Sequence, residues 1–213
     1  MSGRSRRADI ERLTREVKIR GRLNLDGSGR STVSTGIGFL DHMLELFSKH
    51  GLFDLQLKAR GDLHIDLHHT NEDLGLALGE AFRSALGEKR GIRRMGTAFV
   101  PMDESLARVR AVVDLSGRPH LEWGWSAERK PAAFRRGRGG ASGRPDYGLE
   151  DARHFLESFV RKSEVTLHVD VLKAGGDIHH LLESVFKALG RALREAVEVD
   201  PRVRGVPSTK GQL

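Results

Sequence analysis

A histidine-containing pattern occurs twice along this chain of 213 residues, and the repetition limits the possible folds more than any other feature. His42 lies 26 positions before a His-His-x-x-Glu motif at residues 68–72, and His154 lies 25 positions before a second such motif at residues 179–183. Matched residue types at matched spacing are the signature of an internal repeat. The sequence therefore predicts two halves of related structure.

Hydrophobic periodicity predicts the same order of elements in both halves. Alternating apolar residues predict strands, and apolar residues three to four positions apart predict helices. The turn residues Asp-Gly-Ser-Gly at 26–29 predict a hairpin after the first strand. The expected fold is α/β (α+β), with duplicated strand-helix-strand-helix halves and helices packed between two sheets. The expected elements are residues 17–25, 38–50, 52–59 and 70–86 in the first half, and residues 106–115, 150–160, 165–172 and 179–197 in the second.

The division between the halves is predicted near residue 95. Residues 1–95 form the first repeat with an N-terminal arm, and residues 96–213 form the second, which ends in a Ser-Thr-Lys-Gly tail. Residues 127–144 contain six Arg or Lys, four Gly and one Glu, which predicts a basic surface insertion. This insertion and residues 1–30, with nine basic and four acidic residues, carry the net charge of +7, so that charge does not require a nucleic-acid partner.

The composition excludes several classes of chemistry. The absence of cysteine rules out disulfides, thiolate nucleophiles, cysteine-ligated zinc and cysteine-ligated iron–sulfur clusters, and it suits a reducing cytoplasm. No apolar run approaches the roughly 20 residues that span a bilayer, and residues 1–7 do not lead into a signal-peptide core. We therefore expect a cytoplasmic protein without a membrane partner.

The duplicated motif predicts a metal centre. Along a helix, the first His and the Glu of His-His-x-x-Glu share one face, whereas adjacent histidines project about 100° apart. Each pair is therefore expected to divide between two sites, with three imidazoles and one carboxylate for each ion. This donor set suits two Mn²⁺ ions, with Zn²⁺ or Fe²⁺ as the alternatives, and leaves the partition of ligands between them open. The predicted ligands are His42, His68, His69, Glu72, His154, His179, His180 and Glu183.

Four segments, in this order, resemble the imidazoleglycerol-phosphate dehydratase family of histidine biosynthesis. They are Thr-Gly-Ile-Gly-Phe-Leu-Asp-His-Met-Leu at 35–44, Gly-Asp-Leu-His-Ile-Asp-Leu-His-His-Thr-Asn-Glu-Asp at 61–73, Asp-Leu-Ser-Gly-Arg-Pro at 114–119 and Pro-Ser-Thr-Lys-Gly at 207–211. The resemblance extends from about Glu16 to the C-terminus. It implies a fold of the ribosomal protein S5 domain 2 type, a dimanganese site, and trimers assembled into a 24-subunit shell with metal sites between subunits.

The same resemblance implies a hydro-lyase that converts D-erythro-imidazole glycerol phosphate to imidazole acetol phosphate and water. The proton to be removed lies on a carbon beside a hydroxyl, where nothing makes it acidic. A metal-bound imidazolate is expected to expel the hydroxyl and give a diazafulvene-like intermediate, whose neighbouring C–H is acidic. The family's position for the carboxylate that moves this proton falls on Glu16. Its substrate-contacting positions fall on Glu16, His50, Arg94, Arg118, Lys187, Ser208, Thr209 and Lys210.

Three positions depart from the family's common pattern. Leu46 replaces a substrate-contacting Gln, Leu67 replaces an Asp that precedes the His pair, and Gly38 replaces a Pro. Loss of the Asp is expected to remove a partner that orients an imidazole, and loss of the Gln to loosen the placement of the substrate.

Two other functions fit parts of the sequence. Paired metals also activate water, so a dimetal hydrolase of a phosphorylated substrate is one alternative. A basic S5-like nucleic-acid-binding module with structural metals is the other, and salt-sensitive binding that survives chelation would identify it. The twelve aromatic residues (nine Phe, two Trp, one Tyr) are not interleaved with the basic ones as in stacking platforms, so we expect no nucleic-acid partner.

Overall fold

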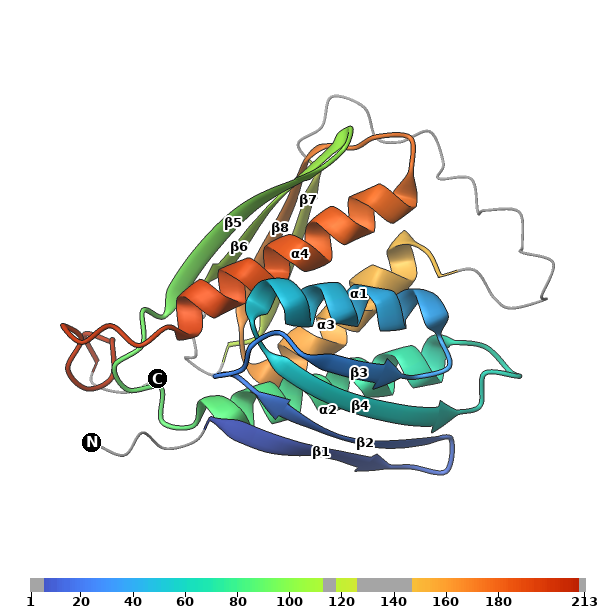
Figure 1. Cartoon of the computed structure of the whole chain (residues 1–213), viewed down its shortest axis with the longest axis horizontal. Coiled ribbons are helices and arrows are strands. Elements are labelled where there is room, and N and C mark those ends of the chain that lie inside the picture. Colours follow the sequence, from blue (N-terminus) through green and yellow to red (C-terminus); the bar gives the residue numbers. More distant parts are fainter. Residues whose placement is uncertain (1–5, 113–117, 126–146, 211–213) are drawn as a thin grey trace.

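The two halves of the chain have the same order of elements, strand-strand-strand-helix-strand-helix (Figure 1). The computed structural model describes residues 6–112, 118–125 and 147–210. The first half contains β1 (Arg7–Leu13), β2 (Val17–Asn24), β3 (Ser31–Ser34), α1 (Gly38–Gly51), β4 (Asp54–Gly61) and α2 (His68–Leu86). The second contains β5 (Met95–Met102), β6 (Ser105–Val112), β7 (His120–Trp125), α3 (Leu149–Ser163), β8 (Thr166–Lys173) and α4 (Ile178–Val197). The basic insertion at 127–144 and residues 114–117 lie outside the described residues.

Each half forms one four-stranded mixed sheet of the same topology. The strand orders are β1-β2-β4-β3 and β5-β6-β8-β7. Within each sheet three strands pair antiparallel, and the fourth pairs parallel with its neighbour, β3 with β4 and β7 with β8. The α+β class and the eight predicted elements are confirmed, the strand predicted at 106–115 as far as Val112, where the described residues stop. Each half has two further strands that periodicity did not predict.

The predicted hairpin across residues 26–29 is wrong. Strand β2 pairs with β1 and β4, whereas β3 lies on the far side of β4 and pairs only with that strand. The carboxylate of Asp54, the first residue of β4, accepts the backbone N–H groups of Ser28 at 2.8 Å and Arg30 at 3.1 Å. These bonds draw the turn across the end of β4. The hairpin is instead formed by β1 and β2, so the predicted N-terminal arm is part of the sheet from Arg7 onward.

All four helices lie between the two sheets, as predicted (Figure 1). Helix α1 packs on α4 of the other half, and α2 packs on α3. Glycine permits the close approach, since a Cβ at Gly190 of α4 would lie 2.5 Å from the Phe47 carbonyl oxygen and 2.9 Å from the Gly51 nitrogen. Both pairs run roughly parallel, which brings together the helix starts that carry the histidine motifs. Among the described residues, no helix has the length and apolar character to cross a bilayer.

Replacing Gly190 with alanine is expected to lower the free energy of unfolding by about 1–3 kcal/mol, because the added methyl group overlaps backbone that cannot rotate away. Urea unfolding at fixed protein concentration measures this change. Gly38→Ala is the matched control, since nothing lies within 4 Å of a Cβ there. Equal stability of the two variants would contradict this account of the helix contact.

Candidate metal centre

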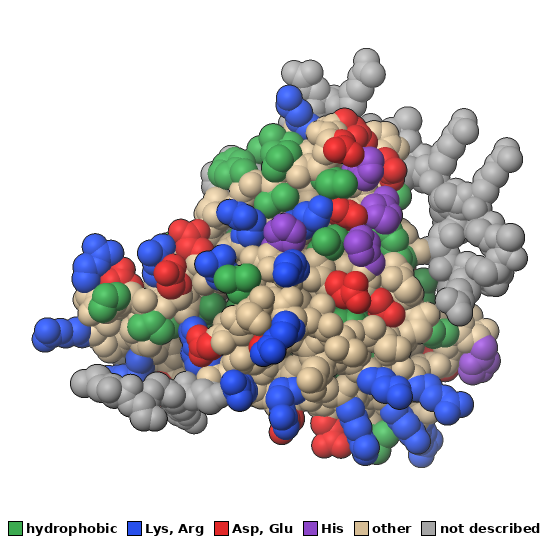
Figure 2. All heavy atoms as spheres, in the orientation of Figure 1, with side chains coloured by type: hydrophobic (Ala, Val, Ile, Leu, Met, Phe, Trp, Pro, Cys, Tyr) green, Lys and Arg blue, Asp and Glu red, His purple; other side chains and the backbone are tan. Residues whose placement is uncertain are grey.

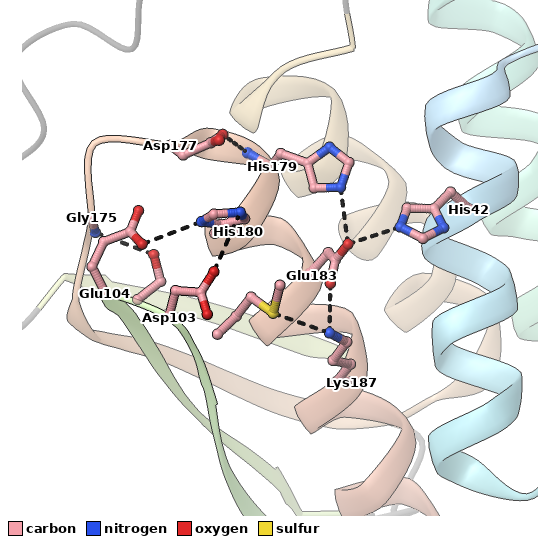
Figure 3. Close-up of polar contacts among 11 residues, drawn as sticks. His42, Asp103, Glu104, Gly175, Asp177, His179, His180, Glu183 and Lys187 are labelled. Carbon is pink, nitrogen blue, oxygen red and sulfur yellow. Dashed lines mark hydrogen bonds and ion pairs between the residues drawn. The ribbon is translucent and has the colours of Figure 1, made fainter.

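Helices from different halves bring two histidines to one glutamate. His42 of α1 and His179 of α4 each place Nε2 at 2.9 Å from the same oxygen, Oε1 of Glu183 (Figure 3). Glu183 is buried, whereas the two imidazoles are partly exposed. The group therefore opens toward solvent on its histidine side. Histidine and acidic side chains gather at the N-terminal end of α4 in the space-filling view (Figure 2).

A second group of the same composition lies on the other pair of helices. His68 and Glu72 of α2 meet His154 of α3, and the His68 and His154 rings stack with centroids 4.3 Å apart. Asp66 and Asp177 occupy equivalent positions in the two halves. Each accepts the backbone N–H of the first histidine of its pair, at 2.8 Å for His68 and 2.7 Å for His179. An aspartate two residues before each motif thus helps to fix where the helix begins relative to the histidine pair.

The ligand atoms of each group match the size of a first-row transition metal site. In both groups each residue offers one ligand atom, and the three ligand atoms all lie within 4.8 Å of one another. Donors about 2.1 Å from an octahedral ion and at right angles lie about 3.0 Å apart. The 2.9 Å separations at Glu183 agree with that value. Two imidazoles and a carboxylate are also the donor types that Mn²⁺, Fe²⁺ and Zn²⁺ accept.

Lys187 keeps the Glu183 carboxylate charged. Its ammonium group lies 2.5 Å from Glu183 Oε2 and 3.4 Å from the sulfur of Met102. Burial raises the pKa of Glu183, but the hydrogen bonds from Lys187, His42 and His179 outweigh it and lower the pKa to about 2. The carboxylate is therefore ionised at neutral pH, as a metal ligand must be.

The second histidine of each pair points to a different group. His69 Nδ1 lies 3.0 Å from Asp62, and His180 Nδ1 lies 3.2 Å from Glu104 (Figure 3 for His180). These hydrogen bonds raise the pKa of both imidazoles. Each pair thus divides, as helix geometry predicts. Among the described residues, the Glu183 group and the Glu72 group each contain two histidines, so neither holds the third imidazole expected for its ion. His69 lies instead in a separate group with Glu16 and Asp62, and His180 lies in one with Asp103 and Glu104.

Glu16 lies beside the first of these outer groups. It ends the turn between β1 and β2, and its carboxylate is 3.8 Å from His69 Nδ1, longer than a hydrogen bond. The side chain is 54 % exposed. Glu16 is therefore close to a predicted metal ligand but open to an incoming molecule.

The predicted phosphate-contacting residues fall in three places. His50, at the end of α1, lies near Lys187, and burial together with the charges of Lys187 and Arg191 lowers the pKa of His50. Arg94 has a left-handed backbone with φ of 70° and donates from Nη1 to the Pro207 carbonyl at 2.6 Å. That bond fixes the segment that contains Ser208, Thr209 and Lys210.

Arg118 lies two residues before β7, the edge strand of the second sheet. Its carbonyl accepts a hydrogen bond from the Thr166 hydroxyl at 3.3 Å, where β7 and β8 begin. Within the chain, the described contacts therefore associate His50 and Lys187 with the Glu183 group, Arg94 with the C-terminal tail, and Arg118 with the β7 edge.

Sequence reasoning missed Asp62, Asp103 and Glu104. Glu104 immediately precedes β6, as Glu16 immediately precedes β2, so aligning the repeats by their strand starts would have found it. Asp62 follows β4 and has no acidic counterpart after β8, where Ala174 follows Lys173. It supplies the orienting contact expected to be lost with Leu67, which is buried in the core instead. Leu46 also packs against the core.

Comparison with known proteins identifies the family. The family model of imidazoleglycerol-phosphate dehydratase matches residues 35–193. The imidazoleglycerol-phosphate dehydratase of Thermobifida fusca is 53% identical over 209 residues, covering 98% of this chain and 100% of the relative. That of Geobacillus kaustophilus is 50% identical over 210 residues, with the same coverage.

Solved structures agree with this assignment. The crystal structure of imidazoleglycerol-phosphate dehydratase from Staphylococcus aureus superposes with a TM-score of 0.72 at 32% identity, covering 91% of this chain and 99% of that one. The enzyme from Pyrococcus furiosus, in complex with (S)-C348, gives 0.73 at 31% identity, covering 96% and 100%. The chain therefore belongs to the imidazoleglycerol-phosphate dehydratase family, hydro-lyases of histidine biosynthesis.

Proposed function

We propose that this dehydratase is metal-dependent and binds two Mn²⁺ ions per active site, with Zn²⁺ or Fe²⁺ as substitutes. The reaction is the conversion of D-erythro-imidazole glycerol phosphate to imidazole acetol phosphate and water. The observation that carries the proposal is the pair of equivalent groups, each with two histidines and one glutamate drawn from both halves of the chain. One such group alone would suit a structural metal, whereas duplication of the same donors favours a two-metal site.

His42, His179 and Glu183 hold one ion, and His68, Glu72 and His154 hold the other. When bound, the ions supply positive charge that favours loss of the N–H proton from the imidazole ring of the substrate. Lys187 keeps Glu183 in place and ionised. Its ammonium group also lies near His50, in a position to contact the phosphate.

Glu16 is the group that moves the substrate's carbon-bound proton. Its carboxylate is exposed, lies beside His69, and is not held by a hydrogen bond from that ring. Such a carboxylate accepts a proton when a substrate carbon is placed against it. Arg94, Ser208, Thr209 and Lys210 form a set of guanidinium, hydroxyl and ammonium groups for the phosphate dianion, with Arg118 as a further cation.

A second copy of the chain is proposed to complete each site. Two imidazoles and one carboxylate leave coordination positions free on an octahedral ion, and His69 and His180 face outward from the groups they were expected to join. An outward histidine from another copy would supply the third imidazole. This arrangement suits an assembly with sites between subunits, such as the 24-subunit shell of trimers implied by the resemblance.

Removing the metal tests the proposal. Chelated protein is expected to lose at least about 100-fold in kcat on imidazole glycerol phosphate, and added Mn²⁺ is expected to restore it, because the ions would supply the positive charge that stabilises the ring anion. Product formation is followed by the appearance of imidazole acetol phosphate. Full activity after complete chelation would overturn the metal requirement. Metal-dependent release of inorganic phosphate instead would favour the dimetal hydrolase.

A further inference from the structure

The backbone of Glu16 is fixed by a single hydroxyl group. Residues 14–16 form the turn between β1 and β2, and the Thr14 N–H donates to the Val17 carbonyl at 2.9 Å. The Thr14 oxygen Oγ1 accepts two backbone N–H groups, from Glu16 at 3.2 Å and from Val17 at 2.9 Å. Loss of this hydroxyl would free both N–H groups and loosen the turn.

The hairpin that contains this turn is joined to α2 by an ion pair. Asp73 belongs to the helix that carries three predicted metal ligands, His68, His69 and Glu72, and it directly follows the last of them. The Asp73 side chain is 11% exposed, and its carboxylate accepts a hydrogen bond from Arg12 Nε at 2.6 Å. Because Arg12 lies two residues before Thr14, this pair fixes the end of β1 against the helix that positions His69.

Asp73 also faces the Thr14 hydroxyl. A threonine oxygen has two lone pairs and one proton, and both lone pairs are directed to the two N–H groups. The proton has two acceptors at 3.4 Å, Asp73 Oδ2 and the Val17 carbonyl. A carboxylate is the stronger acceptor. The network therefore runs from α2 through Asp73 to Arg12 and Thr14, and from Thr14 to the backbone of Glu16.

The second half of the chain shows that this network is not a general feature of the repeat. Ser184 occupies the position of Asp73, directly after Glu183, and its hydroxyl donates to the Leu181 carbonyl of its own helix at 2.7 Å. Glu104 occupies the position of Glu16 and accepts a hydrogen bond from His180 at 3.2 Å. The acid of the second half is thus held by its histidine, whereas the acid of the first half is held by its turn.

We propose that Asp73, acting through Arg12 and Thr14, is a positioning residue that holds the Glu16 carboxylate in the orientation needed for proton transfer. This inference rests on the proposed role of Glu16. His69 Nδ1 is hydrogen-bonded to Asp62 at 3.0 Å and lies 3.8 Å from the Glu16 carboxylate, so His69 does not hold Glu16 in place. A carboxylate left 54% exposed loses its alignment with a substrate carbon unless its backbone is fixed.

Thr14→Val removes the hydroxyl and keeps the side-chain shape. We expect kcat to fall by about 10- to 100-fold with KM and Mn²⁺ content unchanged, since substrate and metal contacts are intact. Thr14→Ser retains the hydroxyl and should recover kcat to within about threefold of the original. Asp73→Asn is expected to lower kcat in the same direction. Normal kcat in either Thr14→Val or Asp73→Asn would overturn the proposal.

A double-mutant cycle separates positioning from general stabilisation. In a Glu16→Gln background, Thr14→Val and Asp73→Asn are expected to change kcat by less than about twofold, because no carboxylate remains to be placed. If Thr14→Val or Asp73→Asn lowers kcat by the same factor with and without Glu16→Gln, the proposal is overturned. Full activity of Glu16→Gln alone would instead refute the role of Glu16, whereas an inactive Glu16→Gln with a normal Thr14→Val refutes only the positioning.

Ser28→Ala is the matched control. Ser28 lies beyond the opposite end of β2, and its hydroxyl also contacts a carboxylate, Asp54, at 3.4 Å. Removing it takes away the same type of contact from the same sheet. We expect unchanged kcat, and a loss equal to that of Thr14→Val would show that the effect is one of sheet stability and overturn the proposal.

Discussion

Replacing Glu16 with glutamine is expected to lower kcat by about 10²- to 10⁴-fold, the range contributed by a positioned general acid or base. Glutamine has the size and polarity of glutamate but cannot accept the proton. Two histidine–glutamate groups are the proposed metal sites, namely His42 with His179 and Glu183, and His68 with Glu72 and His154. Glu16 lies outside both groups, so the content of bound metal is expected to stay the same. The KM is expected to change little, because the proposed role of the carboxylate is at the reacting carbon and not at the phosphate. Steady-state kinetics with metal analysis on the same samples measures both.

Glu11→Gln is the control for this substitution. Glu11 lies on β1, in the same hairpin, and is 72% exposed, with a long ion pair to Arg20 at 3.7 Å. Its loss changes the charge by the same amount without touching the candidate site. A Glu16→Gln enzyme as active as Glu11→Gln would remove Glu16 from the mechanism. A Glu16→Gln enzyme that has lost its metal would make Glu16 a ligand instead of a base.

The interior elements of the fold were predictable from periodicity, and the edge strands were not. Strand β4 alternates Leu55 and Leu57 inward, and α4 keeps an apolar stripe over its length, because each packs a full face on the core. Of the apolar residues in β1 only Ile10 is buried, and β3 is Ser-Thr-Val-Ser. Strands β1 and β3 bury few side chains, and the edge strand β5 exposes Met95 and Phe99 although it buries Ala98 and Val100, so the apolar pattern of these strands is weak.

Which site residues come together was predictable only for residues on the same helix. The four-residue spacing of His179 and Glu183 follows from helix geometry, and the structure brings these two side chains together. The partner of that pair, His42, comes from the other half, and its choice depends on how α1 crosses α4 near Gly190. That crossing is a tertiary contact with no local pattern. Asp62 and Glu104 were missed for a related reason, since they lie in turns where no periodicity marks a functional side chain.

His180→Ala is expected to lower both the metal content and the size of the assembly. His180 lies outside both histidine–glutamate groups of its own chain and faces Glu104, at 29% exposure. A metal held only by His42, His179 and Glu183 of one chain would therefore be retained without His180. If an outward histidine from another copy completes each site, the substitution removes a ligand and a link between copies together.

The expected result is at least a tenfold weaker retention of Mn²⁺, since changes one step further from a metal already cost 10- to 100-fold in affinity. The oligomer is expected to be smaller by mass measurement, and added Mn²⁺ should not restore it, whereas chelated original protein should reassemble when Mn²⁺ returns. His168→Ala is the control, because His168 lies on β8 beside His120 and away from both groups. Unchanged mass together with unchanged metal content in His180→Ala would refute sites shared between copies. Loss of metal with unchanged mass would mean that His180 reaches a metal without joining subunits.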